Sequence, residues 1–188
     1  MKYYVVLDTN VVVSALFNIS SVPGMILQEA LAGRVIPLLH EDILDEYNDV
    51  LHRPKFKFDR RDIEIALTGL IKRGIFLDAA TIEDYVPDPD DAIFYEVVME
   101  ARETTDAYLV TGNIKHFPVK PYVVTPKEML EILNEKLGYF IVALLERHLI
   151  SEVPLTICQQ LHPMIQNGPP APARLLASFK MMDKSHAF

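Results

Sequence analysis

Residues 3–17 of the chain read YYVVLDTNVVVSALF, and this stretch decides the fold. The apolar run Tyr3–Leu7 has the length and the β-branched and aromatic content of a buried strand. The polar residues 8–10 that follow are typical of a turn or of the start of a helix, and residues 11–17 read as a short helix. A strand that leads directly into a helix predicts a sheet of parallel strands joined by helices.

The same alternation of short apolar runs and longer amphipathic runs continues along the chain. Further strands are predicted at residues 35–39, 75–77, 107–110 and 122–124. Helices are predicted at residues 25–32, from 41 to the Arg53-Pro54 stop, at 60–73, at 88–103 and from 126 onward. About five strands with intervening helices predict a three-layer α/β/α sandwich around a central, mostly parallel sheet. In such sheets, binding sites form outside the carboxyl ends of the strands.

Length and composition limit the class of protein. The chain has 188 residues, half of them hydrophobic, which excludes a disordered protein and fits one domain with a core. Its formal charge of −8 argues against a broad basic surface that binds nucleic acid. The single cysteine, Cys158, cannot form an internal disulfide, and no apolar run is long enough for a signal peptide or a membrane span. We therefore expect a cytoplasmic protein without a membrane partner.

Charge is unevenly distributed, and this predicts a domain boundary near residue 136. Residues 1–135 hold most of the acidic side chains, whereas residues 136–188 hold few charges and a proline-rich run. We expect a functional domain at 1–135 and an extension at 136–188. The extension is predicted to contain one apolar helix, at about 138–150, and then an extended or disordered segment.

Three acidic residues occupy positions at which a site can form. Asp8 follows the first strand, where it either contributes to a site or simply starts a turn, with Asn10 as the cap of the next helix. Glu46 lies beside the apolar stripe of its helix, between Ile43 and Val50, so it either needs a partner or reaches water at the edge of the stripe. Asp91 points inward from the start of its helix, where an acid also suits the helix dipole.

Polar residues also surround the predicted strand at 107–110. Thr111 and Asn113 follow this strand and offer a hydroxyl and a carboxamide to a ligand, or they form an ordinary turn. Asp106 precedes the strand and is either a turn residue or a further acid near the site. Asp88, before the acidic helix start, is interpreted as a helix cap.

Four motifs occur in a characteristic order: VVLDTNVVVSALF, ILDEYNDVLHRPKF, DPDDAIFYEVV and DAYLVTGNIKHFP. Together, over Lys2–Glu135, they resemble the PIN-domain family of metal-dependent ribonucleases, particularly the branch of toxins from toxin–antitoxin systems. The resemblance implies that Asp8, Glu46 and Asp91 are the catalytic and metal-binding acids. The fourth family position, often an aspartate, falls on Asn113, which is a departure from the fully acidic pattern. The other secondary site candidates are Asn10, Ser14, Asp106 and Thr111.

Several carboxylates in one site repel one another unless they are protonated or bind a cation. Oxygen ligands favour Mg²⁺ or Mn²⁺, as one or two ions, over zinc. The expected activity is hydrolysis of RNA phosphodiester bonds, with Asp8 and Asp91 as the primary ligands and Glu46 as a ligand through water or as the base. His116 has the chemistry of a general acid but is interpreted as a loop residue packed near Phe117, outside the catalytic set. The candidates for RNA contact are Arg53, Lys55, Lys57, Lys115 and His116.

The resemblance also implies partners, and two other functions stay open. The expected partners are RNA, a cognate antitoxin protein and further copies of the chain, as a homodimer or higher oligomer. One alternative is a module that binds metal or RNA without cleaving it. The other is a haloacid-dehalogenase-like phosphatase with Asp8 as the nucleophile, although Asp8-Thr9-Asn10 lacks the usual DxD pattern.

Overall fold

The computed structural model describes residues 2–82 and 86–134. The chain divides into two units, Met1–Leu130 and Glu131–Phe188, and the account below concerns the first. The predicted domain boundary near residue 136 lies outside the described residues. So do the apolar helix and the proline-rich segment predicted beyond it.

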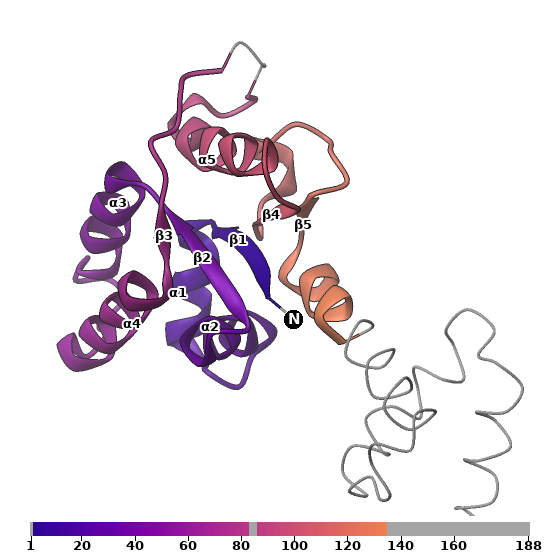
Figure 1. Cartoon of the computed structure of the whole chain (residues 1–188). Coiled ribbons are helices and arrows are strands. Elements are labelled where there is room, and N and C mark those ends of the chain that lie inside the picture. Colours follow the sequence, from indigo (N-terminus) through magenta and orange to yellow (C-terminus); the bar gives the residue numbers. More distant parts are fainter. Residues whose placement is uncertain (1, 83–85, 135–188) are drawn as a thin grey trace, which may run out of the picture. The chain divides into compact units, whose positions relative to one another are not determined.

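Strands and helices alternate along the first unit (Figure 1). In chain order the elements are β1 Tyr3–Leu7, α1 Thr9–Phe17, α2 Val22–Ala32, β2 Val35–Leu39, α3 Glu41–Leu51, α4 Arg60–Arg73, β3 Ile75–Phe76, the 3-10 helix η1 Pro89–Asp91, α5 Ala92–Arg102, β4 Ala107–Val110, the 3-10 helix η2 Ile114–His116 and β5 Val123–Val124. Helical backbone follows from residue 126 to the end of this unit.

All five strands are parallel and lie in the order β3-β2-β1-β4-β5. The first strand of the sequence is therefore the central strand of the sheet, and Tyr4 is paired with Ile36 of β2 on one side and with Ala107 of β4 on the other. The chain first builds outward through β2 and β3, and then returns to add β4 and β5 on the opposite side. In open α/β sheets, the point at which the strand order reverses is where ligands bind, and here it lies between β1 and β4.

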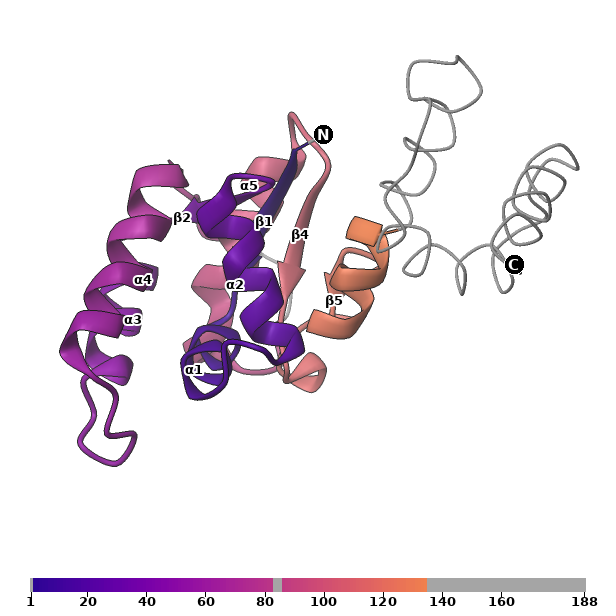
Figure 2. The ribbon, with the colours of Figure 1, turned by 90° about the horizontal axis from the view of Figure 1, so that it is seen from below.

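Helices cover both faces of this sheet, so the predicted α/β sandwich is confirmed. Helix α5 lies over β4, β1 and β2 on one face, whereas α1 and α2 lie on the other (Figures 1 and 2). Successive side chains of a strand point to opposite faces, and Val5 and Val6 of β1 are both fully buried. A central strand that is covered on both sides explains why Tyr3–Leu7 is continuously apolar.

Two helices begin earlier than the sequence predicts, because polar side chains cap them. Helix α1 starts at Thr9 rather than residue 11, since the Asp8 side chain accepts a hydrogen bond from the Asn10 backbone N–H. Helix α2 starts at Val22 rather than residue 25, since Ser21 caps it in the same way. It ends as predicted at Gly33, whose φ of 84° is the left-handed conformation that glycine favours.

The helix predicted over residues 88–103 forms in two parts. Asp88 does cap the segment, because its side chain accepts a hydrogen bond from the Asp90 N–H. The first turn, Pro89–Asp91, is a 3-10 helix, and the α-helix follows from Ala92 to Arg102.

No single helix among the described residues is long and apolar enough to cross a membrane. Only α1 and α2 taken together, with a bend of 102° between them, have that length and composition.

Candidate active site

A cleft of about 350 Å³ opens at the carboxyl ends of β1 and β4, where the strand order reverses. We call it the acidic cleft because Asp8, Glu46 and Asp91 all line it. The other lining residues are Thr9, Asn10, Val13, Ser14, Val50, Phe56, Asn113 and His116. The structure thus brings together three acids that are far apart in the sequence, along with the secondary candidates Asn10, Ser14 and Asn113. Thr111 is fully buried and does not line the cleft, but its hydroxyl donates a hydrogen bond to Asp8.

Asp8 is buried at the base of the acidic cleft, with 4% of its surface exposed. Its Oδ2 accepts hydrogen bonds from the Thr111 hydroxyl at 2.5 Å and from the Asn10 carboxamide at 2.6 Å, and its Oδ1 accepts one from the Asn10 backbone N–H at 3.1 Å. Burial raises the pKa of the Asp8 carboxyl, although these hydrogen bonds oppose the rise. The negative charge of Asp91 raises it further.

The hydrogen bonds of Asp8 also join the ends of the two strands. The Asn10 side chain extends to the loop after β4, where its Oδ1 accepts a hydrogen bond from the Gly112 N–H at 2.9 Å. A Cβ atom on Gly112 would lie 3.0 Å from this Oδ1, so the residue must be small for the carboxamide to approach. Thr111 accepts a hydrogen bond from the Asn113 N–H at 2.8 Å. The polar residues after β1 and β4 therefore form one network.

Glu46 reaches the acidic cleft from α3. The Thr9 hydroxyl donates a hydrogen bond of 2.5 Å to its Oε1, and the side chain is half-buried. Burial raises the pKa of the Glu46 carboxyl, the Thr9 hydrogen bond opposes this, and the charges of Asp91 and Asp8 add to it. The next residue, Tyr47, holds α3 in place because its hydroxyl donates a hydrogen bond to the Leu7 carbonyl at the end of β1.

Asp91 forms a second group with Asp88 and His116. Nδ1 of His116 lies 2.7 Å from an Asp91 oxygen and 3.0 Å from an Asp88 oxygen. Ligand atoms of these three residues lie within 4.8 Å of one another, an arrangement that can hold a metal ion. On the other side of the ring, Nε2 of His116 is 2.5 Å from the Asn113 amide nitrogen. With the proton on Nδ1, Nε2 accepts from Asn113 while Nδ1 donates to Asp91.

Sequence reasoning underestimated two members of this group. Asp88 was interpreted only as a cap and His116 only as a loop residue or phosphate contact. The spacing of Asp88 and Asp91, three residues apart at a helix start, is a local signal that both side chains can face one site. No local signal marks His116, because its approach to Asp91 depends on where η2 packs.

Other predicted residues are not part of the lining of the acidic cleft. Asp106 precedes the first residue of β4, so it lies at the amino end of a strand whose carboxyl end faces the cleft. It is not part of this site, since side chains at the two ends of a four-residue strand are separated by the length of that strand. Lys55, Lys57 and Lys115 are exposed and do not line the cleft. Arg53 is also exposed and forms an ion pair with Asp49 at 2.7 Å.

Residues 4–115 match the PIN domain family model, which covers more than half of the chain, and the chain belongs to this family. PIN domains are part of a nuclease superfamily and are generally metal-dependent. Among curated proteins, the chain is similar to "Uncharacterized protein MJ1680" of Methanocaldococcus jannaschii. The two are 28% identical over 147 residues, which span 70% of this chain and 92% of that protein. No solved structure matches the chain.

Proposed function

We propose that the protein is a metal-dependent ribonuclease that hydrolyses RNA phosphodiester bonds in the acidic cleft. The observation that carries this proposal is the convergence of Asp8, Glu46 and Asp91 in one cleft at the reversal of the strand order. Membership of the PIN domain family supports the nuclease activity. Beyond nuclease activity, we propose that the substrate is RNA and that the ion is Mg²⁺ or Mn²⁺.

The donor set of the acidic cleft fits a divalent cation. No Lys or Arg is among the described residues that line it, so the charge of the three carboxylates is not neutralised by a basic side chain of the lining other than His116. Asp8 accepts three hydrogen bonds, and a carboxylate offers about four acceptor positions, which leaves one for a further ligand. Oxygen donors of this kind suit Mg²⁺ or Mn²⁺.

The three acids have two roles in the proposed reaction. Asp8 and Asp91 would hold the ion, with a second ion optional beside Asp88, Asp91 and His116. When bound, such an ion polarises the scissile phosphate and lowers the pKa of a water molecule. Glu46 is the proposed proton acceptor for the attacking water, because its raised pKa brings it closer to neutral pH and only its Oε1 is held by Thr9.

The hydrogen-bond network gives Asp8 a fixed orientation. Thr111 and Asn10 hold one of its oxygens, and the backbone N–H of Asn10 holds the other. A carboxylate that is positioned before substrate arrives pays little reorganisation in the transition state. The proposed role of Thr111 and Asn10 is therefore to position Asp8.

The test is cleavage of a mixed single-stranded RNA pool by the purified full chain in Mg²⁺ or Mn²⁺. Asp8→Asn keeps the shape of the side chain but removes its charge, so we expect a loss of about 100-fold or more. Asp106→Asn is the matched control, since it makes the same chemical change at the far end of β4, and it should cleave at the wild-type rate. Chelation of the metal should abolish cleavage by the wild type.

Three outcomes would contradict this proposal. Equal cleavage by wild type and Asp8→Asn would show that the acidic cleft is not the active site. RNA binding without cleavage by either protein would support a non-catalytic module. A trapped aspartyl-phosphate on Asp8 would support a phosphatase instead.

We further propose that the protein acts as the toxin of a toxin–antitoxin pair, with a cognate antitoxin protein and self-association into a homodimer or higher oligomer. The support is the resemblance of the four motifs to the toxin branch of the family. An active ribonuclease with broad substrates harms its own cell, which is the physical reason that a restraining partner is expected.

A further inference from the structure

Three phenylalanine rings, one exposed and two partly exposed, form a cluster next to the acidic cleft. Phe17 is the last residue of α1, whereas Phe56 and Phe58 belong to the loop between α3 and α4. The Phe56 and Phe58 rings stack with centroids 5.5 Å apart, and the Phe17 ring forms T-shaped pairs with both, at centroid distances of 5.6 and 4.7 Å. Phe17 remains 60% exposed. We call these three rings the aromatic platform.

Basic side chains surround the aromatic platform. Lys55 lies over the Phe56 ring, with its Nζ 4.8 Å from the centroid. A second hollow, of about 170 Å³, is lined by Phe58 together with His52, Arg53, Lys57 and Arg60. No Asp or Glu is among the described residues that line it. We call it the basic hollow, and its lining has the opposite charge to that of the acidic cleft.

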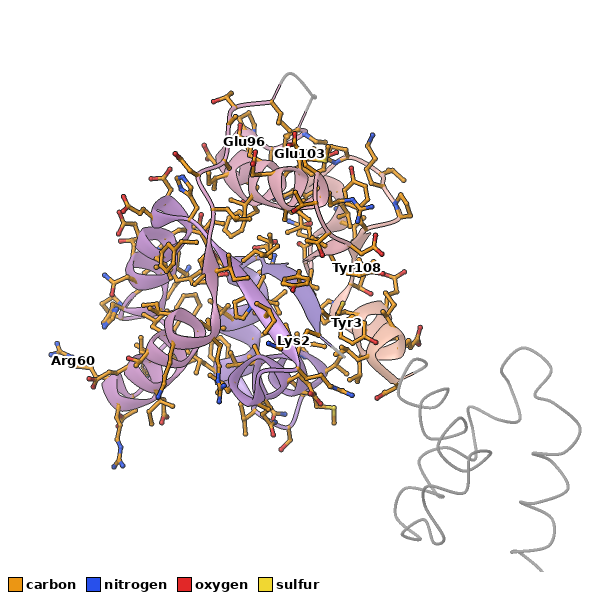
Figure 3. All side chains as sticks on the ribbon, in the orientation of Figure 1. Lys2, Tyr3, Arg60, Glu96, Glu103 and Tyr108 are labelled. Atoms are coloured by element: carbon orange, nitrogen blue, oxygen red, sulfur yellow. The ribbon has the colours of Figure 1, made fainter. Side chains whose placement is uncertain are left out.

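The aromatic platform lies between the two hollows. Phe56 lines the acidic cleft, Phe58 lines the basic hollow, and the two rings are stacked on each other. The loop that carries them projects beyond the ends of α3 and α4 (Figure 2), and Arg60, at the start of α4, points away from the domain (Figure 3). A ligand that touches both hollows therefore lies close to the Phe56 and Phe58 rings.

A cluster of aromatic side chains that only anchored the loop would not need this exposure or this charge. An exposed Phe17 ring forgoes the stability that the protein would gain by burying it. The exposed ion pair between Arg53 and Asp49 adds little stability either. Four cations in one short segment are also notable in a chain with a net charge of −8. Exposed rings interleaved with cations are the features that bind single-stranded nucleic acid, through base stacking and phosphate contacts.

We propose that the aromatic platform and the basic hollow bind a single-stranded RNA segment next to the bond to be cleaved. Unpaired bases stack on Phe17 and the adjoining rings, and a backbone phosphate enters the basic hollow between Lys57 and Arg60. This inference rests on the proposed ribonuclease activity, because it names the form of substrate that the acidic cleft receives. Paired bases cannot expose their faces, so the platform selects single strands over duplex.

The first experiment measures binding apart from cleavage. The full chain with Asp8→Asn, in metal-free buffer, is titrated against a short fluorescein-labelled single-stranded RNA and against a hairpin of the same composition. We expect weaker binding to the hairpin. Adding Phe17→Leu should weaken single-strand binding roughly tenfold, the order expected for the loss of one base stack. Because Phe17 is exposed, this change leaves no cavity in the core.

Matched variants separate the ring from the charges. Phe76→Leu changes another half-exposed phenylalanine, on β3, which lines neither hollow, and it should leave affinity unchanged. Lys57→Gln should lower the slope of log affinity against log salt by about 0.7, the contribution of one phosphate contact to a single strand. Lys72→Gln, at the exposed far end of α4, should leave that slope unchanged.

A second experiment observes stacking directly. The chain contains no tryptophan, so Phe17→Trp introduces a single tryptophan at the platform, which can be excited at wavelengths where tyrosine does not absorb. Its fluorescence should be quenched when single-stranded RNA is added, whereas Phe76→Trp should not respond. This variant keeps a large ring, so it should also retain the affinity that Phe17→Leu loses.

Several results would overturn the inference. These are equal affinity for the single strand and the hairpin, unchanged affinity after Phe17→Leu, or no quenching of the introduced tryptophan. A dimer that Phe17→Leu converts to a monomer would instead assign the platform to a second copy of the chain. These assays measure binding without cleavage, so they can be read separately from the ribonuclease test. Binding that depends on Phe17, in a protein whose wild type does not cleave RNA, would contradict the proposed activity and still support the aromatic platform as an RNA-binding surface.

Discussion

At the scale of single residues, Asp8 shows how one carboxylate joins fold and site. It caps α1 and lines the acidic cleft. It also accepts a hydrogen bond from Thr111, the residue that follows the neighbouring strand β4. Burial of this side chain costs stability whenever it is ionised, because the charged form is less well solvated than in the unfolded chain. The cost is a property of the site, and it predicts a pH dependence.

The metal-free protein should become less stable as the pH rises from about 4 toward neutral. Burial raises the pKa of Asp8 above its ordinary 3.8 and that of Glu46 above 4.5. Between the ordinary and the raised pKa, the folded state binds more protons than the unfolded state, so stability falls with increasing pH through this window. Asp8→Asn removes one of the two contributions and should make the decline shallower.

Denaturant unfolding at several pH values, with the metal chelated, measures this decline. Asp106→Asn is the control, since it changes an exposed acid outside the acidic cleft. It should follow the wild-type pH dependence. A decline of equal steepness in wild type and Asp8→Asn would mean that Asp8 is not destabilised by its burial.

At the scale of elements, the turn between α1 and α2 packs directly against Gly24, in the first turn of α2, and leaves no room for a side chain there. A Cβ atom there would lie 2.3 Å from the Ile19 carbonyl oxygen and 2.7 Å from that of Asn18. Both contacts are with backbone, which cannot move aside without reshaping the turn. The turn follows Phe17, so its geometry also helps to position the aromatic platform.

Gly24→Ala should therefore destabilise the fold by about 2 kcal/mol or more, the order seen for overpacked positions. Gly69→Ala, inside α4, is the comparison, because its Cβ would meet mainly the flexible end of the Leu31 side chain. Alanine favours the helix interior by about 0.5–1 kcal/mol, which offsets the rearrangement of Leu31. Denaturant unfolding should show a large loss for Gly24→Ala and a change of less than about 1 kcal/mol for Gly69→Ala. Equal effects would contradict this account of the turn.

At the scale of the whole molecule, the charge of −8 is compatible with an RNA substrate because of its distribution. Three of the acidic side chains line one cleft, and basic side chains gather beside it in the loop between α3 and α4. Contact with RNA is then local, which fits brief cleavage better than tight, sequence-independent binding.

If the chain is a toxin, its induced expression should arrest the growth of a bacterial host. Arrest requires the catalytic site, so Asp8→Asn should allow growth at the rate of an empty vector, whereas Asp106→Asn should arrest growth as the wild type does. Co-expression of an antitoxin encoded beside the gene should restore growth. Normal growth with wild-type protein present at the same level, and active on RNA in vitro, would contradict the toxin role and leave the ribonuclease activity standing.

Much of the fold follows from local patterns in the sequence. The strand Tyr3–Leu7, the strand Val35–Leu39 and the helix Arg60–Arg73 form as predicted, because apolar periodicity and glycine or proline stops act over a few residues. The starts of α1 and α2 were predicted too late, because a cap such as Asp8 or Ser21 lies outside the apolar run.

The sequence by itself determined the parallel sheet, because strand and helix patterns act at short range. It also named the three acids that line the acidic cleft, through the order of the four motifs that resemble the PIN-domain family. Only the tertiary structure decided that His116 contacts Asp88 and Asp91, and that Phe17 meets Phe56 and Phe58. These contacts join residues from separate elements, so they depend on the order of the strands and the packing of the loops, which a local pattern does not contain.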